Sequence, residues 1–420
     1  MVETIITGCK VLQGEPGGYV LEWKDVLVED GVIKRVDDKR DLDGNLKVID
    51  GKNTHILLPG FIDNHIHSRM IDHCVHHPWN DKSIVPDLYH QCRKILERAY
   101  REAKDSGTVL LMDYPEYPFD FDLEKDNWKM PFEVMRQEGL RGVVRVLLSH
   151  DKIPESSFLK KTLEELVLCD IKRIKMAEDS FPESRVAVWI PEEKWFNERR
   201  GWKEEVSMKV IKYLQGLYEQ SDENVYFVMH CAETKIRTDE IRELGYENGV
   251  DFLLKNGLLG DRTVLVHCRY GIRDEDVEYI KEAGSRVVVR TSKREYDGEK
   301  SVCPLQKFID KGVIVGFGTD VPVVRKEVRR GFEIIPEIYN AMDIYDINFQ
   351  TSYDIATRGG ARVFGFDGMG KIENGYNASL LMFDVQEDLR AREEKRKPYL
   401  IQDLEKALNK STLRHVSMNS

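Results

Sequence analysis

The sequence predicts an α/β protein in which a (β/α)8 TIM barrel is inserted into a small β-sandwich domain formed jointly by the N- and C-terminal segments. Three observations favour this fold. The first 55 residues have the pattern of short β-strands separated by turns. Apolar strand patterns then alternate with charged amphipathic stretches, and strand patterns alone return near residue 366. Strands that alternate with helices are typical of a parallel sheet, and α/β barrels of about 250 residues form one domain.

The N-terminal segment contains strand patterns and no helix pattern. Its apolar runs are "TIITGCKVL", "YVLEWKDVLVEDGVIKRVDD" and "LKVIDG". Glu29, Asp30 and Gly31 interrupt the second run and predict a hairpin turn there. We expect the late run "GKIENGYNASLLMFDV" to rejoin these strands in one sheet.

These patterns predict two domains. The small β domain comprises residues 1–55 and 366–420, and the barrel comprises residues 56–365. The tail from about residue 387 reads as a charged helix or a flexible end, and no function can be read from it.

The barrel region contains eight apolar runs of strand length. They are "ILLPGFIDNHIH", "GTVLLMDY", "LRGVVRVLLS", "RVAVWI", "VYFVMHC", "TVLVHC", "SRVVVRT" and "VIVGFGTD". The stretches between them include helix patterns such as "PDLYHQCRKILERAYREAKDSG" and "DEDVEYIKEAG", which end in the glycine typical of helix C-termini. In a barrel of this kind the catalytic groups lie at the C-terminal ends of the strands.

Composition excludes several classes of protein. Charged residues make up 33% of the chain with a net charge of -11, and the two signs are mixed rather than gathered into a basic patch, which argues against nucleic acid as a partner. The seven cysteines are scattered without a CxxC spacing, so we expect neither a disulfide framework nor a thiolate zinc site. This use of cysteine favours a location in the reducing cytoplasm. No signal peptide and no apolar run of membrane-spanning length is evident, so we expect no membrane partner.

Two histidines lie on alternate positions of the first barrel strand. Side chains at i and i+2 share one face of a strand, so His65 and His67 are expected to project together at the barrel mouth. A pair of imidazoles can bind a metal, although hydrogen-bonded core histidines are an equally good interpretation of this pair alone.

Other strand ends carry matching groups. His230 ends "VYFVMH", His267 ends "TVLVH" and Asp320 ends "VIVGFGTD". The barrel rule brings these ends together, which favours a metal centre. Nitrogen ligands with one carboxylate suit Zn²⁺, and by residue type Fe²⁺, Mn²⁺ or cobalt also fits.

The motifs resemble the amidohydrolase superfamily. "LLPGFIDNHIH", "HCAET", the histidine after "TVLV", "GVIVGFGTD" and "ATRGGARVFGFDGMGKIENGYNASLLMFD" carry the likeness, which runs from about residue 1 to residue 385. Within the superfamily they are similar to the mononuclear branch of cytosine, guanine and methylthioadenosine deaminases and triazine hydrolases. The resemblance implies one divalent metal, and the metal ligands it implies are His65, His67, His230 and Asp320.

The resemblance also implies catalytic roles. Asp320 would accept a proton from the metal-activated water, Glu233 would donate a proton to a ring nitrogen, and His267 would orient the attacking oxygen. The expected reaction is hydrolysis of a carbon–nitrogen bond other than a peptide bond, with deamination of a small amino-substituted heterocycle (purine, pyrimidine or pterin-like) preferred. Opening of a cyclic amide or displacement of chloride at the same centre is the alternative reaction. A barrel without catalytic activity is the alternative from a different class of function. A homodimer is expected by analogy only.

Binuclear relatives bridge two metals with a carboxylated lysine after strand four. The expected fourth strand, "RVAVWI", has no lysine, and Lys175 lies just before it. Lys175 would be the bridging ligand if the strand count slipped by one element, and otherwise it is a solvated helix or loop charge.

The substrate is not determined by these motifs. "TSKRE" at 291–295 and "PEEKWFNERRGW" after strand four depart from the family pattern. His73, His76 and His77 are expected in a loop over the barrel mouth as solvent-facing or structural residues, with substrate contact as the alternative. Four residues are candidates for binding a planar or anionic ligand: Arg69, Trp195, Arg269 and Arg290. Each is equally well explained as a surface charge or a core aromatic residue.

Overall fold

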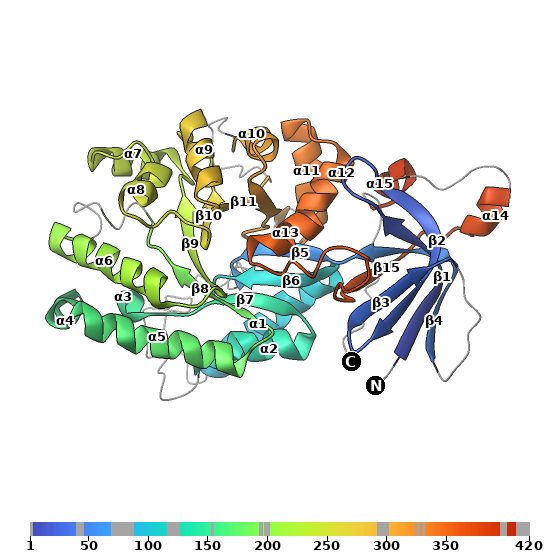
Figure 1. The fold of residues 1–420 in the computed structure, drawn as a ribbon, viewed down its shortest axis with the longest axis horizontal. Helices are drawn as coiled ribbons and strands as arrows, with labels where there is room; N and C mark the ends of the chain where they lie inside the picture. The colour runs from blue at the N-terminus through green and yellow to red at the C-terminus, as the bar shows by residue number, and fades with distance from the viewer. Residues whose placement is uncertain are drawn as a thin grey trace.

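A computed structural model shows an eight-stranded sheet surrounded by helices, beside a separate five-stranded sheet (Figure 1). The residues that the structure describes are 3–38, 46–68, 88–115, 127–152, 155–192, 196, 202–291, 302–322, 324–325, 328–329, 332–394 and 401–408. Structural statements below refer to these residues.

The eight-stranded sheet is a parallel barrel. Its strands pair in chain order, and the first and last are linked by a parallel bridge between Ile66 and Asp320. They are β5 (Phe61–Ile66), β6 (Thr108–Asp113), β7 (Arg141–Arg145), β8 (Arg185–Trp189), β9 (Val225–Cys231), β10 (Thr263–His267), β11 (Arg286–Val289) and β12 (Ile314–Phe317). The predicted eight strands and their order are confirmed.

Both faces of the barrel sheet are buried. Val143, Val228 and Val266 belong to an apolar cluster inside the barrel, whereas Val144, Phe227 and Leu265 belong to a second cluster that includes residues of the surrounding helices. A strand that is buried on both faces reads as a continuous apolar run, which is why the sequence pattern located these strands well.

The helices follow the strands around the barrel. Gly107, Gly257 and Gly284 each lie two residues beyond the last residue of a helix and have positive φ, as predicted for glycine at helix C-termini. The helices are α1 (Leu88–Asp105), α2 (Met130–Glu138), α3 (Ser149–Lys152), α4 (Glu155–Lys160), α5 (Leu163–Ser180), α6 (Glu204–Gln220), α7 (Lys235–Glu243), α8 (Gly249–Lys255), α9 (Asp274–Glu282), α10 (Leu305–Asp310), α11 (Ile335–Tyr345), α12 (Phe349–Asp354) and α13 (Gly360–Val363), with a 3-10 turn η3 (Asn127–Lys129) and a π-helical turn η5 (Ile355–Gly359). A two-residue pair, β13 (Val324–Arg325) and β14 (Val328–Arg329), follows the last barrel strand.

The five-stranded sheet is built from both ends of the chain. Its order is β15-β4-β1-β2-β3, with β1 and β4 parallel and the other pairs antiparallel. The strands are β1 (Glu3–Gln13), β2 (Val20–Glu29), β3 (Val32–Asp37), β4 (Lys47–Pro59) and β15 (Leu380–Asp384). The expected hairpin between β2 and β3 is confirmed, with Asp30 and Gly31 both at positive φ.

The run "ILLPGFIDNHIH" is divided between the two sheets, which corrects its prediction as one strand. Residues 56–59 end β4, and β5 begins at Phe61. At Gly60 a Cβ atom would lie 2.2 Å from Val109 Cγ1, so a side chain there would collide with β6. The run is apolar throughout because both parts are buried, and the residue pattern alone therefore cannot place the break. The domain boundaries remain a prediction.

The C-terminal tail contains two short helices, α14 (Leu389–Glu394) and α15 (Ile401–Leu408). Trp23 Nε1 of β2 donates to Glu393 Oε2 over 2.9 Å, and Leu404 and Leu408 are buried. These contacts hold the tail against the rest of the chain. Its reading as helix is correct for these residues.

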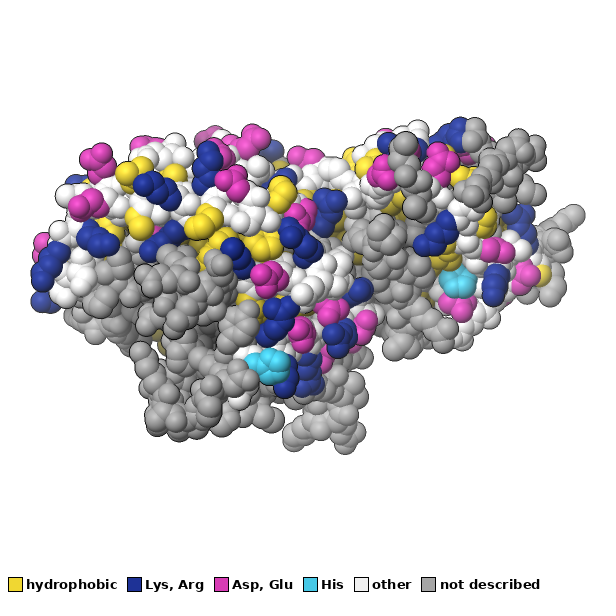
Figure 2. Space-filling view, turned by 90° about the horizontal axis from the view of Figure 1, so that it is seen from below, with side chains coloured by type: hydrophobic (Ala, Val, Ile, Leu, Met, Phe, Trp, Pro, Cys, Tyr) yellow, Lys and Arg dark blue, Asp and Glu magenta, His cyan; other side chains and the backbone are white. Residues whose placement is uncertain are grey.

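The described surface carries mixed charge. Lys and Arg side chains are interspersed with Asp and Glu on the face seen in Figure 2, without a field of one sign. Among the helices that the structure describes, none has the length and apolar character needed to cross a membrane.

Gly318 offers a test of barrel closure. A Cβ atom there would lie 2.7 Å from His65 Cβ and 3.0 Å from His65 N, so Gly318→Ala should push β5 away from β12. We expect a loss of about 1–3 kcal/mol in stability, measured as a lower thermal midpoint of the metal-free protein. Gly368→Ala is the matched control, because a Cβ atom at Gly368 meets nothing within 4 Å. Equal midpoints for the two variants would contradict the close approach.

Candidate metal centre and active site

The first and last barrel strands meet through their backbones at the site. His67 N donates to Asp320 O, and Asp320 N donates to His65 O, both over 2.7 Å. Asp320 has a φ of 63°, a left-handed conformation that a non-glycine residue rarely adopts. These contacts turn the loop after β12 back onto β5, so the Asp320 side chain faces the two histidines.

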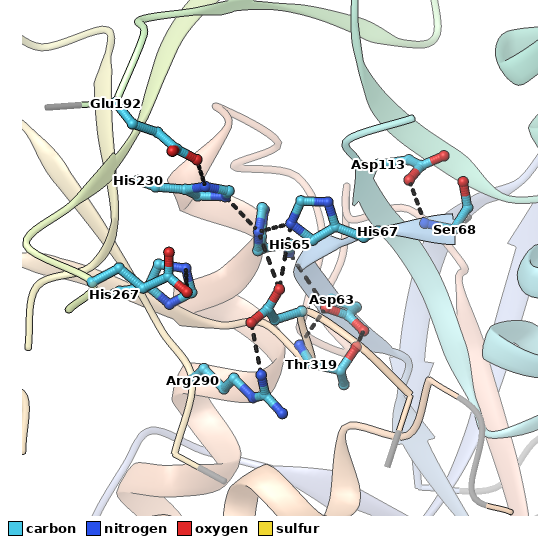
Figure 3. A network of polar contacts seen from close by, with 12 residues as sticks. Asp63, His65, His67, Ser68, Asp113, Glu192, His230, His267, Arg290 and Thr319 are labelled. Carbon is cyan, nitrogen blue, oxygen red and sulfur yellow. Dashed lines mark hydrogen bonds and ion pairs between the residues drawn. The ribbon is translucent and has the colours of Figure 1, made fainter. Parts of the chain in front are cut away.

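Three imidazoles and one carboxylate converge at the barrel mouth (Figure 3). The Nε2 atom of His65 lies 3.1 Å from Nε2 of His67 and 3.0 Å from Nε2 of His230. Asp320 Oδ1 lies 3.4 Å from His67 Nε2 and 3.8 Å from His65 Nε2. All four side chains are buried. His65 lies on β5 and His67 directly after it, His230 lies on β9, and Asp320 lies in the loop after β12.

These donors fit a divalent cation. With metal–nitrogen distances of about 2.0–2.1 Å, neighbouring ligand atoms of a tetrahedral site lie about 3.3–3.4 Å apart. The donor separations of 3.0–3.8 Å bracket that value. Three nitrogens and one carboxylate oxygen are also the donor types that Zn²⁺ and similar cations take.

Burial sets the protonation of these groups for metal binding. Loss of hydration, followed by the neighbouring imidazoles, holds the pKa of His65 and of His230 well below the usual value. Burial alone would raise the pKa of Asp320, but His267, His67 and Arg290 hold that pKa well below its usual range. Neutral imidazoles and an ionised carboxylate are the forms that ligate metal.

Glu233 and His267 adjoin the same cluster. Glu233 follows β9 and is buried, and its Oε1 lies 4.0 Å from Nε2 of His267. One donor atom from each of His230, Glu233 and His267 lies within 4.8 Å of the other two. The structure therefore brings together all six residues that the sequence named for the metal and for catalysis.

The family comparison agrees with this geometry. The model of the amidohydrolase family matches residues 203–416, just over half of the chain. The chain belongs to the amidohydrolase family.

Similar amidohydrolases span nearly the same length. A 5-methylthioadenosine/S-adenosylhomocysteine deaminase of Dictyoglomus turgidum is 21% identical over 387 residues, which cover 88% of this chain and 82% of that protein. The structure of E. coli guanine deaminase superposes with a TM-score of 0.74 at 15% identity, covering 99% of this chain and 98% of that one. An adenosine deaminase from Xanthomonas campestris with bound zinc gives 0.65 at 19% identity, covering 91% and 85%. At these identities the structural likeness establishes the fold.

The alternative of a bridging lysine is wrong for this amidohydrolase. Lys175 is exposed on α5, and the fourth barrel strand, β8, ends at Trp189. The fourth barrel strand is the one that the sequence predicted, so Lys175 is a solvent-exposed charged residue of a helix.

The expected substrate residues have different placements. Arg290 is buried and its Nη1 donates to Asp320 Oδ2 over 2.7 Å, so its guanidinium lies against the carboxylate. Arg269 is half-buried after β10, with its backbone N bonded to Ala232 O. Arg69 and Trp195 lie outside the described residues, as do the loop histidines at 73–77 and residues 292–295. A role of any of these residues in binding a substrate remains a prediction.

An aromatic wall that the sequence did not predict lies beside the metal cluster. The Trp189 ring is 4.3 Å from that of Tyr114 and 4.4 Å from that of His230, between centroids. Arg145 Cζ lies 4.1 Å from the Tyr114 centroid. Tyr114, Arg145 and Trp189 stand at the C-terminal ends of β6, β7 and β8, which was the signal available in the sequence.

Two acidic residues that the sequence reasoning missed support the ligands. Asp63 accepts hydrogen bonds from Thr319 Oγ1 (2.7 Å), Thr319 N (3.0 Å) and His65 N (3.3 Å). Burial raises the pKa of Asp63 to about 7, although these three hydrogen bonds act in the opposite direction. Glu192 Oε1 lies 3.0 Å from His230 Nδ1. A carboxylate in a strand that is otherwise apolar, as in "FIDNHIH", was the available signal for Asp63.

Asp63→Asn tests the link between β5 and the loop after β12. The amide group cannot accept from all the donors that now bond to the carboxylate, so at least one buried donor loses its partner. We expect a loss of about 1–3 kcal/mol in stability, seen as a lower thermal midpoint. Asp310→Asn, at an exposed position of α10, should leave the midpoint nearly unchanged. A midpoint equal to that of the control would show that Asp63 does not support the site.

Proposed function

We propose that this amidohydrolase is a zinc-dependent aminohydrolase that removes ammonia from an amino-substituted nitrogen heterocycle. The observation that carries the proposal is the convergence of three Nε2 atoms and the Asp320 carboxylate, with Glu233 and His267 beside them. The deaminase names of its relative from Dictyoglomus turgidum and of its structural neighbour from E. coli support the choice of reaction. The zinc bound by the Xanthomonas campestris protein supports the choice of metal.

The metal would be held by His65, His67, His230 and Asp320. A divalent cation at this position supplies Lewis-acid activation of water at neutral pH. The chain's own contribution is the buried neutral imidazoles of His65 and His230 and the ionised carboxylate of Asp320, oriented before the cation arrives.

The chain's other groups supply proton transfer and ring binding. Arg290 holds Oδ2 of Asp320, which leaves Oδ1 directed at the histidines as the proton acceptor. Glu233 is buried beside His267 and is the group placed to protonate a ring nitrogen, while His267 orients the attacking oxygen. The rings of Tyr114 and Trp189, inclined at 63° to each other, pack beside the histidines and would exclude water from that side of the site.

The reaction is tested by ammonia release. Zinc-loaded protein should release ammonia from at least one member of a panel of amino-substituted purines, pyrimidines, pterins and nucleosides, including 5′-methylthioadenosine. Glu233→Gln should keep its zinc and lower kcat by about 100- to 10,000-fold, because the proton donor is lost. Glu243→Gln, at an exposed position of α7, should keep the wild-type rate. A panel without ammonia release would refute deamination, and undiminished turnover by Glu233→Gln would refute its role.

Asp320→Asn tests the ligand set. Loss of the ionised oxygen should lower zinc affinity by more than the 10- to 100-fold typical of outer-shell changes, and turnover should fall with it. Zinc content after dialysis against a chelator, with affinity from chelator competition, measures this effect without a substrate. Asp274→Asn changes an exposed carboxylate and should retain zinc as the wild type does. Full zinc retention by Asp320→Asn would exclude Asp320 as a ligand.

A further inference from the structure

Four charged or polar side chains form a closed ring behind the metal cluster. Glu192 follows β8, and its Oε1 lies 3.0 Å from His230 Nδ1 while its Oε2 lies 3.1 Å from Arg237 Nη2. Arg237, in the first turn of α7, places Nη1 2.5 Å from Glu233 Oε2. The chain itself closes the ring, since Glu233 is three residues beyond His230. Figure 3 shows Glu192 directed at the imidazole of His230.

The charges in this ring determine where the two carboxylates can lie. The Glu192 and Glu233 side chains are only 12% and 8% exposed, and the same guanidinium contacts both. Two neighbouring buried carboxylates would repel each other without a cation between them. The guanidinium is suited to this position, because its delocalised positive charge forms ion pairs with both carboxylates at once.

His230 and Glu233 each direct one side-chain atom away from the ring and toward the site. With Nδ1 of His230 bonded to Glu192, its Nε2 atom faces Nε2 of His65. A carboxylate that accepts from one ring nitrogen fixes the tautomer in which the other nitrogen can bind metal. In the same way, Arg237 holds Oε2 of Glu233 while Oε1 faces His267.

We propose that Glu192 and Arg237 are positioning residues that hold the metal ligand His230 and the proton-transfer residue Glu233 in fixed orientation relative to each other. The part concerning Glu233 rests on the proposed function. Glu192 acts on metal affinity through His230, and Arg237 acts on turnover through Glu233.

The test measures zinc affinity and steady-state kinetics separately. Glu192→Ala should lower zinc affinity by about 10- to 100-fold, whereas Glu192→Gln keeps an oxygen acceptor for His230 and should lose less. Arg237→Met should lower kcat by about 10- to 100-fold with little change in KM, because Glu233 is no longer held. It should lower zinc affinity less than Glu192→Ala does, because Glu192 keeps its own contact with His230. Arg237→Lys retains a cation between the carboxylates and should recover part of kcat.

The control is Lys235→Met. Lys235 lies on the same helix in an exposed ion pair with Asp239, so neither zinc affinity nor kcat should change. Wild-type zinc affinity in Glu192→Ala overturns the role of Glu192, and wild-type kcat in Arg237→Met overturns that of Arg237. If either variant fails to fold, Glu192→Gln and Arg237→Lys carry the same comparison. If the wild type releases no ammonia from the panel, the proposed function fails, and zinc affinity in Glu192→Ala still decides the role of Glu192.

Discussion

Closure of the barrel between β5 and the loop after β12 is the contact on which the site depends. The two backbone hydrogen bonds between Asp320 and the histidine pair join residues from the first and last strands. Asp63 adds side-chain bonds to Thr319 across the same seam, and Gly318 allows the strands to approach. A metal site needs ligands that are held in place before the metal binds, and the closed sheet holds the proposed ligands in this way. The Asp320 backbone adopts a strained left-handed conformation that this surrounding structure maintains.

The same burial that stabilises the barrel also prepares its chemistry. Removing the imidazoles from water disfavours their charged forms, so His65 and His230 stay neutral. Asp320 is equally buried, yet His267, His67 and the Arg290 guanidinium hold its pKa well below the usual range, so it stays ionised. Both kinds of group are therefore deprotonated, which is the form that ligates metal: burial itself disfavours the charged imidazoles, whereas the neighbours of Asp320 outweigh burial.

The aromatic residues beside the proposed substrate site belong to the barrel core. Tyr114 and Trp189 belong to the apolar cluster inside the barrel and pack against His67 and His230, two of the proposed metal ligands. Core packing thus continues directly into the wall of the proposed ring-binding site. Glu192 lies in the segment after strand four in which the sequence departs from the family pattern, and there it contacts His230.

The sequence by itself determined the fold class and the eight strands, and it placed five residues of the proposed centre at strand ends. It could do so because continuous apolar runs mark strands buried on both faces, and because a polar residue that ends such a run lies at the barrel mouth. Glu233 came from the resemblance to the amidohydrolases, as did the roles of all six residues. Only the tertiary structure decided that the first run is split at Gly60, that Lys175 is exposed, and that Arg290 lies against Asp320. It alone revealed the ring of Glu192 and Arg237. Those facts depend on which residues meet across elements far apart in the chain, and a periodic pattern along one segment carries no information about its partner.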